Sequence, residues 1–348
     1  MNNRSSNIEL LRIVAMLLVI FLHANYLSLG VIKVDDINNE PVISFVRILF
    51  QQLCIVSVNI FVLIAGWFGI KPSLKGAMSL LYQVFFFSLL ITATMIFMGV
   101  ETSLKSVLLP FYFGVSWWFV PAYLILYAVS PILNTFCEKT SPKVQFFTLV
   151  AFFSVQFIYD FIGSYAHFIK GYSAISFIGL YILARFVKLH SEKLKSISRK
   201  TNILLYLLFT IIPVLLTYIN CPRIIWLAYN NPFVIAASLF ILLAFVKIQF
   251  DNKFINYIAC SAFSIYLVHM HPLVIPYFIR TMKTAYETLG GDIYILFVVG
   301  LAIVFGLLCV MLDKLRIASW NFLYKTIISK IITQIEVLFL KIYEWIIN

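Results

Sequence analysis

Three ionisable side chains lie on the first apolar stretch of the chain, residues 7–26, and their spacing suits chemistry inside a membrane. Glu9 and Arg12 are three residues apart, and His23 follows Arg12 by eleven. In a helix, eleven residues return almost to the starting face and advance about 16 Å, so Arg12 and His23 share one side. Ionisable groups in lipid are costly and mark function or a partner. The pattern predicts a site that runs into the membrane.

A second set of polar side chains lies late in the chain, at residues 260–272. Tyr266 and His269 are three residues apart and share a helix face, whereas His271 lies roughly opposite. At 1.5 Å per residue, His269 lies about 18 Å along its apolar stretch, and His23 about 22 Å along its own. The two histidines can therefore meet if their helices are neighbours. Hydrogen bonding between helices would also explain these side chains.

Two further groups of residues have side chains that suit substrates. The aromatic residues Trp117, Trp118 and Tyr123 begin another apolar run, where they can form an interfacial belt or a platform for sugar rings. Lys71 and Lys75 follow an earlier run, one helical turn apart. They can receive phosphate groups, and a positive-inside loop explains them equally well.

The composition is typical of a polytopic membrane protein. The 348 residues are 62% hydrophobic and 11% charged, whereas soluble domains are about 25% charged. The net charge of +12 is a topology signal and predicts no binding to nucleic acid. The five cysteines are scattered singly, without metal-ligand spacing or a disulfide framework, so we expect packing residues and no metal.

Ten apolar runs are long enough to cross the hydrocarbon core, which takes about 20 residues. They lie at residues 8–29, 43–69, 76–98, 117–137, 144–163, 171–189, 202–219, 232–249, 257–278 and 292–312. No repeat or linker divides them. We therefore expect an all-α, ten-span membrane domain at residues 1–312.

The positive charges orient these spans. With the N-terminus in the cytosol, 19 of the 26 Lys and Arg residues fall on the inner side and seven on the outer side. The basic loop at 188–200 then lies inside and the acidic loop at 34–40 outside. We expect both termini in the cytosol of a multi-pass cell-membrane protein. Residues 313–348 are amphipathic and predict a helix lying on the inner leaflet, with an eleventh span as the alternative.

The motifs resemble those of the acyltransferase-3 family of integral membrane acyltransferases, over about residues 7–312. The family pattern of an acidic residue, arginine and histidine in the first span matches Glu9, Arg12 and His23. In the second span, Ala65 replaces a family serine, and Lys71 and Lys75 follow where the family usually has arginines. Two more family segments, Ser-x-Tyr-Leu-x-His and Trp-Phe with later Tyr and Pro, match Ser264, Tyr266, Leu267 and His269, and Trp118, Phe119, Tyr123, Tyr127 and Pro131.

The resemblance implies transfer of an acyl group, usually acetyl, from cytosolic acyl-CoA to a hydroxyl of a cell-surface or lipid-linked polysaccharide. The residues agree with this, because a large anion at the inner face needs cations such as Arg12, Lys71, Lys75 or the 188–200 loop. The thioester then needs a buried base, which we assign to His23, either by direct transfer or through an acyl-histidine. His269 and Tyr266 would orient that base or polarise the thioester carbonyl.

Two other functions fit a chain with many spans and buried polar groups. A transporter or flippase of a lipid-linked saccharide is the alternative, although broken-helix inverted repeats are not evident. A glycan polymerase is the second, although the outer loops are short. Consumption of acyl-CoA together with O-acyl ester on surface glycan would separate the three.

The charge distribution makes a topology prediction. In intact cells, a cysteine placed in the 188–200 loop should be shielded from impermeant thiol reagents, whereas Asn38→Cys should react. The reverse labelling pattern would contradict the orientation.

Overall fold

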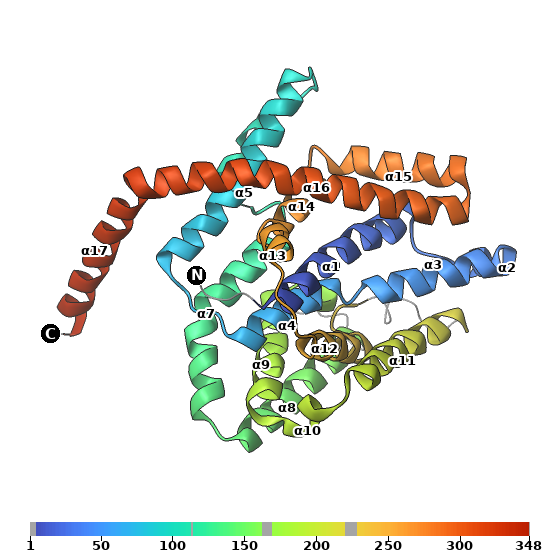
Figure 1. Cartoon of the computed structure of the whole chain (residues 1–348), viewed down its shortest axis with the longest axis horizontal. Coiled ribbons are helices and arrows are strands. Elements are labelled where there is room, and N and C mark those ends of the chain that lie inside the picture. The colour runs from blue at the N-terminus through green and yellow to red at the C-terminus, as the bar shows by residue number, and fades with distance from the viewer. Residues whose placement is uncertain (1–4, 113, 162–168, 220–227, 348) are drawn as a thin grey trace.

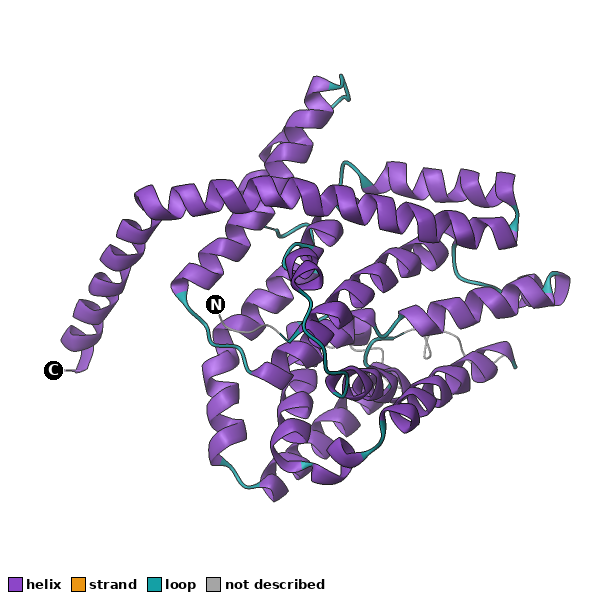
Figure 2. Cartoon of the chain, in the orientation of Figure 1, coloured by secondary structure: helices purple, strands orange, loops and turns teal. Residues whose placement is uncertain are grey.

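The computed structural model describes residues 5–112, 114–161, 169–219 and 228–347, and in these ranges the chain forms helices and loops without a strand (Figure 2). The longer helices are α1 (Ser6–Leu22), α3 (Pro41–Cys54), α4 (Ser57–Phe68), α5 (Leu74–Phe97), α7 (Phe119–Lys139), α8 (Pro142–Phe161), α9 (Ala174–His190), α11 (Arg199–Tyr218), α12 (Pro232–Val246), α15 (Ile275–Leu289), α16 (Gly291–Leu323) and α17 (Ser329–Ile347). The shorter ones are η1 (His23–Leu27), α2 (Val34–Asn39), α6 (Leu104–Leu108), η2 (Leu109–Tyr112), η3 (Ile169–Gly171), α10 (Glu192–Ser196), α13 (Lys253–Ala259), α14 (Ala262–His269) and η5 (Tyr324–Ile328).

Within the described ranges, six helical stretches are long and apolar enough to cross a membrane. They are Ser6–Leu27, Pro41–Phe68, Leu74–Phe97, Phe119–Lys139, Arg199–Tyr218 and a window within Ile293–Ile347. This confirms an all-helical, multi-pass protein. A count of ten spans, cytosolic termini and an interfacial tail stay predictions. The tail itself is helical, since α16 continues past residue 312 to Leu323 and a π-helical turn leads into α17, which projects away from the other helices (Figure 1).

The ninth predicted span, 257–278, is wrong as a single helix. The structure divides it into α13, α14 and the start of α15. The second break has a local cause, because Pro272 has no backbone N–H and disfavours helical geometry at the residue before it. The second predicted span, 43–69, is likewise divided, into α3 and α4, by a turn at residues 55–56.

Helix α1 lies between the two larger hydrophobic clusters of the protein, which explains its central place in Figure 1. Ile8, Leu11 and Ala15 pack into the cluster formed mainly by α4, α7, α9 and α12. Met16, Val19 and Ile20 pack into the other cluster, with residues of α5, α14 and α16. The helix that carries Arg12 and His23 is therefore held on both sides.

Close contact between α4 and α9 depends on Gly66. A Cβ at this position would overlap the backbone of Tyr181 and lie 3.0 Å from the Cβ of Ala184. The absence of a side chain at Gly66 thus permits the close packing of α4 against α9. Gly69 has a different role, since it ends α4 with a φ of +77° that favours glycine.

Gly66→Ala should destabilise the protein, because the added methyl group overlaps backbone that cannot rotate away. Overpacking of this kind costs about 1–3 kcal/mol. Gly300→Ala on α16 is the matched control, since a Cβ there meets nothing within 4 Å and alanine favours a helix by about 1 kcal/mol. Thermal unfolding in detergent should give a lower Tm for Gly66→Ala only. Equal Tm values for the two variants would contradict the packing argument.

Candidate active site

His23 and His269 form a direct hydrogen bond, with 2.9 Å between His23 Nδ1 and His269 Nε2. The expectation that the two histidines can meet is thus confirmed. His269 Nδ1 lies 2.6 Å from the carbonyl oxygen of Ile265, which can only accept, so this nitrogen carries the proton. In neutral rings, His269 Nε2 is then the acceptor and His23 Nδ1 the donor. This leaves Nε2 of His23 with an unshared electron pair.

The turn that carries His23 is wider than a regular helical turn. Residues 23–27 form a π-helical turn, a rare feature often found at functional sites. The Ser28 hydroxyl donates to the carbonyl oxygen of His23 at 2.9 Å, and the Tyr294 hydroxyl donates to that of Ala24 at 2.7 Å. Two side chains thus bind carbonyl groups of the widened turn, and one of these side chains, that of Tyr294, belongs to α16.

A polar cluster on α3 binds the same turn from another side. Asn25 donates to the Arg47 carbonyl oxygen at 2.9 Å and to Gln51 Oε1 at 3.2 Å. Arg47 returns a hydrogen bond from Nε to Asn25 Oδ1 at 3.0 Å, and its NH2 donates to the carbonyl oxygen of Gly30 at 2.7 Å. Asn25 and Gln51 are both buried. The orientation of His23 is therefore fixed by three helices, α1, α3 and α16.

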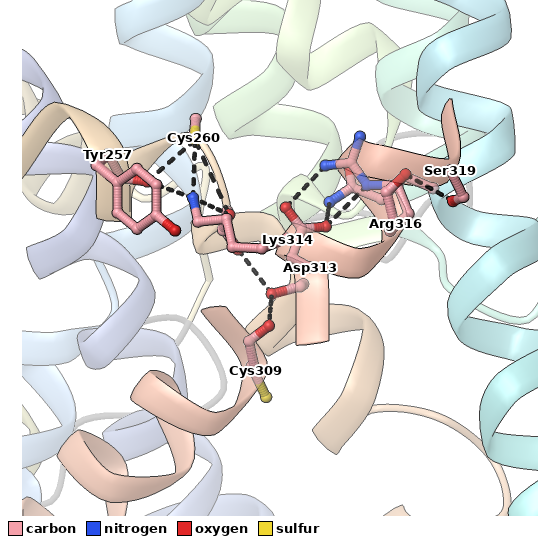
Figure 3. A network of polar contacts seen from close by, with 10 residues as sticks. Tyr257, Cys260, Cys309, Asp313, Lys314, Arg316 and Ser319 are labelled. Atoms are coloured by element: carbon pink, nitrogen blue, oxygen red, sulfur yellow. Dashed lines mark hydrogen bonds and ion pairs between the residues drawn. The ribbon is translucent and has the colours of Figure 1, made fainter. Parts of the chain in front are cut away.

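The start of α14 is fastened to α16 by Lys314 (Figure 3). Its Nζ donates to the Tyr257 carbonyl oxygen at 2.6 Å and to the Ser261 hydroxyl at 3.0 Å, and lies 3.3 Å from Cys260 Sγ. One turn later, the Ser264 hydroxyl donates to the carbonyl oxygen of Cys309 at 3.1 Å. These contacts fix the helix that carries His269.

A buried ion pair on α16 connects the same region to α5. Arg316 donates to Asp313 from Nε at 2.9 Å and from NH2 at 2.7 Å (Figure 3), and Gln83 donates to Asp313 Oδ1 at 3.1 Å. Asp313 is fully buried, and a buried carboxylate needs such partners. The pair stabilises the junction of α5 and α16 on one side of the site.

His23 lines a small cavity of about 40 Å³. Tyr266 also lines it and is buried, and its hydroxyl lies toward the backbone of Phe119 without a hydrogen bond of ordinary geometry. The other lining residues are Met16, Val19, Val58, Phe61, Trp118, Phe119, Tyr229 and Phe263.

Arg12 lines a large cavity of about 480 Å³ together with Lys71, Tyr123 and Tyr127. Arg12 NH1 donates to Glu9 Oε1 at 2.8 Å, and Glu9 is buried whereas Arg12 is partly exposed. The buried carboxylate holds the guanidinium at the cavity. A partly exposed guanidinium in a cavity of this size can bind an anion through its remaining N–H groups.

The structure separates some residues that the sequence analysis grouped together. Lys75 lies over the ring of Tyr324 at 4.1 Å and does not line the large cavity as Lys71 does. Among the aromatic residues, Tyr123 lines the large cavity and Trp118 the small one.

Trp117 lines neither cavity. It is buried edge-on against His271, with ring centroids 5.4 Å apart. From the basic 188–200 loop, the Nζ of Lys188 lies 5.2 Å from the ring centroid of Phe68, which does line the large cavity.

Several residues of the site were missed from the sequence. Phe61 and Phe263 line the small cavity from helices, where an apolar ring carries no signal of its own, and Tyr229 lines it from a turn. Tyr229 is buried and stacks on Trp118 with ring centroids 6.1 Å apart. The carbonyl oxygen of Ile265, which decides the protonation of His269, belongs to the backbone and has no sequence signature.

A family model described as an acyltransferase domain matches residues 5–314, which include the two paired histidines and every residue that lines the two cavities. The chain belongs to the acyltransferase-3 family. Searches of the curated proteins and of the solved structures found no match to this chain. This acyltransferase-3 protein is therefore a multi-pass membrane acyltransferase.

The hydrogen bonds of the pair predict one tautomer for both rings. In ¹⁵N-histidine spectra of the protein in lipid near pH 8, His23 and His269 should each carry the proton on Nδ1 and leave Nε2 unprotonated. Loss of single signals in His23→Gln and His269→Gln would assign them, with His271→Gln as the matched control. A His23 ring protonated on Nε2 alone would contradict the deduced hydrogen-bond direction.

Proposed function

We propose that this acyltransferase moves an acyl group, acetyl in the simplest case, from cytosolic acyl-CoA to a hydroxyl of a cell-surface or lipid-linked polysaccharide. The observation that carries the proposal is that two neighbouring cavities contain different functional side chains. A histidine with an unshared pair on Nε2 lines one cavity, and an arginine lines a second cavity with three of the same wall residues. Membership of the family supports acyl transfer in general.

The large cavity is the proposed site for the anionic end of the donor. Acyl-CoA carries phosphates that cannot enter lipid, so cations must hold them at the membrane face. Arg12 and Lys71 both line this cavity. The planar fork of Arg12, oriented by the buried Glu9, suits phosphate oxygens better than a lysine would. Tyr123 and Tyr127 add ring faces and hydroxyl groups to the same wall.

The proposed chemistry takes place in the small cavity. Nε2 of His23 removes the proton from the acceptor hydroxyl as its oxygen attacks the thioester carbonyl carbon. The carbon–sulfur bond then breaks, and the departing thiolate receives that proton from His23, so that coenzyme A leaves as a thiol. Tyr266 lines the same cavity, and in this scheme its hydroxyl donates to the oxygen that becomes negative during attack.

His269 acts through His23 in this scheme. Both of its nitrogens are already bonded, and the residue is fully buried, so it is a positioning residue. Its Nε2 holds Nδ1–H of His23 and favours the charge that the ring carries after taking the proton. The Ile265 carbonyl holds His269 in the matching tautomer.

The acceptor is proposed to approach from the side of Trp118 and Tyr229. These rings line the small cavity, and both contact Tyr172, at centroid distances of 4.6 Å and 4.7 Å. Tyr172 is 39% exposed, so the aromatic group extends from the surface to the cavity. Aromatic faces of this kind stack on sugar rings.

Substitutions should separate donor binding from chemistry. His23→Gln should bind acyl-CoA normally and lose acyl transfer by a factor on the order of 10²–10⁴, because an amide cannot act as the base. Arg12→Ala should weaken acyl-CoA binding about 10- to 100-fold, since charge-assisted hydrogen bonds contribute about 1.5–3 kcal/mol. Calorimetry on purified protein measures binding, and thiol release with O-acyl ester formation measures transfer.

A matched pair of lysine variants tests the donor site further. Lys71→Ala should weaken acyl-CoA binding, and Lys75→Ala should change it much less, because only Lys71 lines the large cavity. Near wild-type transfer by a folded His23→Gln protein would remove His23 from the mechanism. Unchanged donor affinity in both Arg12→Ala and Lys71→Ala would remove the donor from the large cavity.

A further inference from the structure

We infer that Phe61, Phe119 and Phe263 form a constriction between the two cavities, which admits a thioester with a short acyl chain to His23 and excludes longer chains. The inference deepens the proposed function and rests on it. The three residues, called the phenylalanine constriction below, come from α4, α7 and α14. Their side chains carry no charge and form no hydrogen bonds, so they draw attention only through the cavities that they line.

The constriction consists of the residues that line both cavities. Phe61, Phe119 and Phe263 line both the small cavity of His23 and the large cavity of Arg12, and they are the three residues common to the two linings. The ring of Phe119 lies 6.4 Å from that of Phe61 and 6.0 Å from that of Phe263, between centroids. Rings at these distances are in contact. The three rings thus separate the two cavities, and a thioester moving from Arg12 to His23 has to displace them or pass between them.

The distance from Arg12 to His23 requires a long, narrow arm of the donor between them. Arg12 and His23 are about 16 Å apart along the axis of α1. The phosphates of the donor stay in the large cavity, so an extended, unbranched arm must carry the thioester through the constriction. The acyl group at its tip is then the part of the donor that enters the small cavity.

The small cavity limits the size of that tip. Its volume of about 40 Å³ compares with about 480 Å³ for the large cavity. The small cavity is thus more than ten times smaller than the large one, which suits a short acyl group such as acetyl. A hexanoyl group has four more carbon atoms and would require the rings to move.

Phe119 cannot easily move. Its ring stacks on Tyr123 at 5.8 Å and also contacts Phe177 at 5.4 Å and Tyr266 at 6.0 Å. Phe61 and Phe263 have fewer ring contacts and are half-buried. Shortening either of these two side chains enlarges the passage while the contacts of Phe119 with the core remain.

The test compares acetyl-CoA with hexanoyl-CoA in the purified full-length protein, by thiol release coupled to O-acyl ester formation. Phe61→Ala and Phe263→Ala should each raise the hexanoyl-to-acetyl ratio of kcat/KM at least tenfold. Phe263→Leu should raise it less, and Phe263→Trp should slow even acetyl transfer while acyl-CoA still binds. Phe209→Ala is the matched control, since this half-buried ring on α11 stacks on Phe240 and lines neither cavity.

The outcomes distinguish this inference from the proposed function. Acetyl transfer by the wild type, with an unchanged chain-length ratio in Phe61→Ala, Phe263→Ala and Phe263→Leu, would overturn the constriction alone. A ratio that rises equally in Phe209→Ala would also overturn it. If the wild type turns over neither thioester, the proposed function fails and the inference fails with it.

Discussion

The hydrogen bond between His23 and His269 is the interaction on which the rest of the site depends. The ring of His269 is fully buried inside a protein that is mostly apolar, so both of its nitrogens need partners. The Ile265 carbonyl supplies one and thereby decides the direction of the whole chain of hydrogen bonds. The unshared pair that remains, on Nε2 of His23, belongs to a ring that lines the small cavity.

Keeping the two rings in place requires that α1 and α14 cannot shift. Side chains from α3 and α16 hold the π-helical turn of His23, and Lys314 and Ser264 hold α14 against α16. Helix α16 thus contributes to both halves of the pair. A displacement of a catalytic group by about 1 Å can lower the rate about 100-fold. Hydrogen bonds that are distant from the reacting atoms can therefore affect activity by holding the histidines in place.

The break between α13 and α14 also contributes to the site. Non-helical backbone at membrane depth is tolerated where protein or a cavity surrounds it. Here Ser261 is fully buried and bonded to Lys314, and the neighbouring residues Ala259, Cys260 and Ala262 line the large cavity. The break brings residues of the large cavity and His269 onto one short stretch of chain. Phe263, one residue further, lines both cavities.

The sequence by itself determined the all-helical membrane class, because apolar composition and run length are set by the hydrocarbon core. It also predicted, from helical periodicity, that Arg12 and His23 share a helix face and, from the rise per residue, that His23 and His269 lie at similar depth. Only the tertiary structure decided that the ninth predicted span is also broken between α13 and α14, that Lys71 and not Lys75 lines the large cavity, and that three phenylalanines line both cavities. Those features depend on which helices are neighbours and on how a backbone carbonyl, a lysine and apolar rings pack, and no local pattern of residues encodes them.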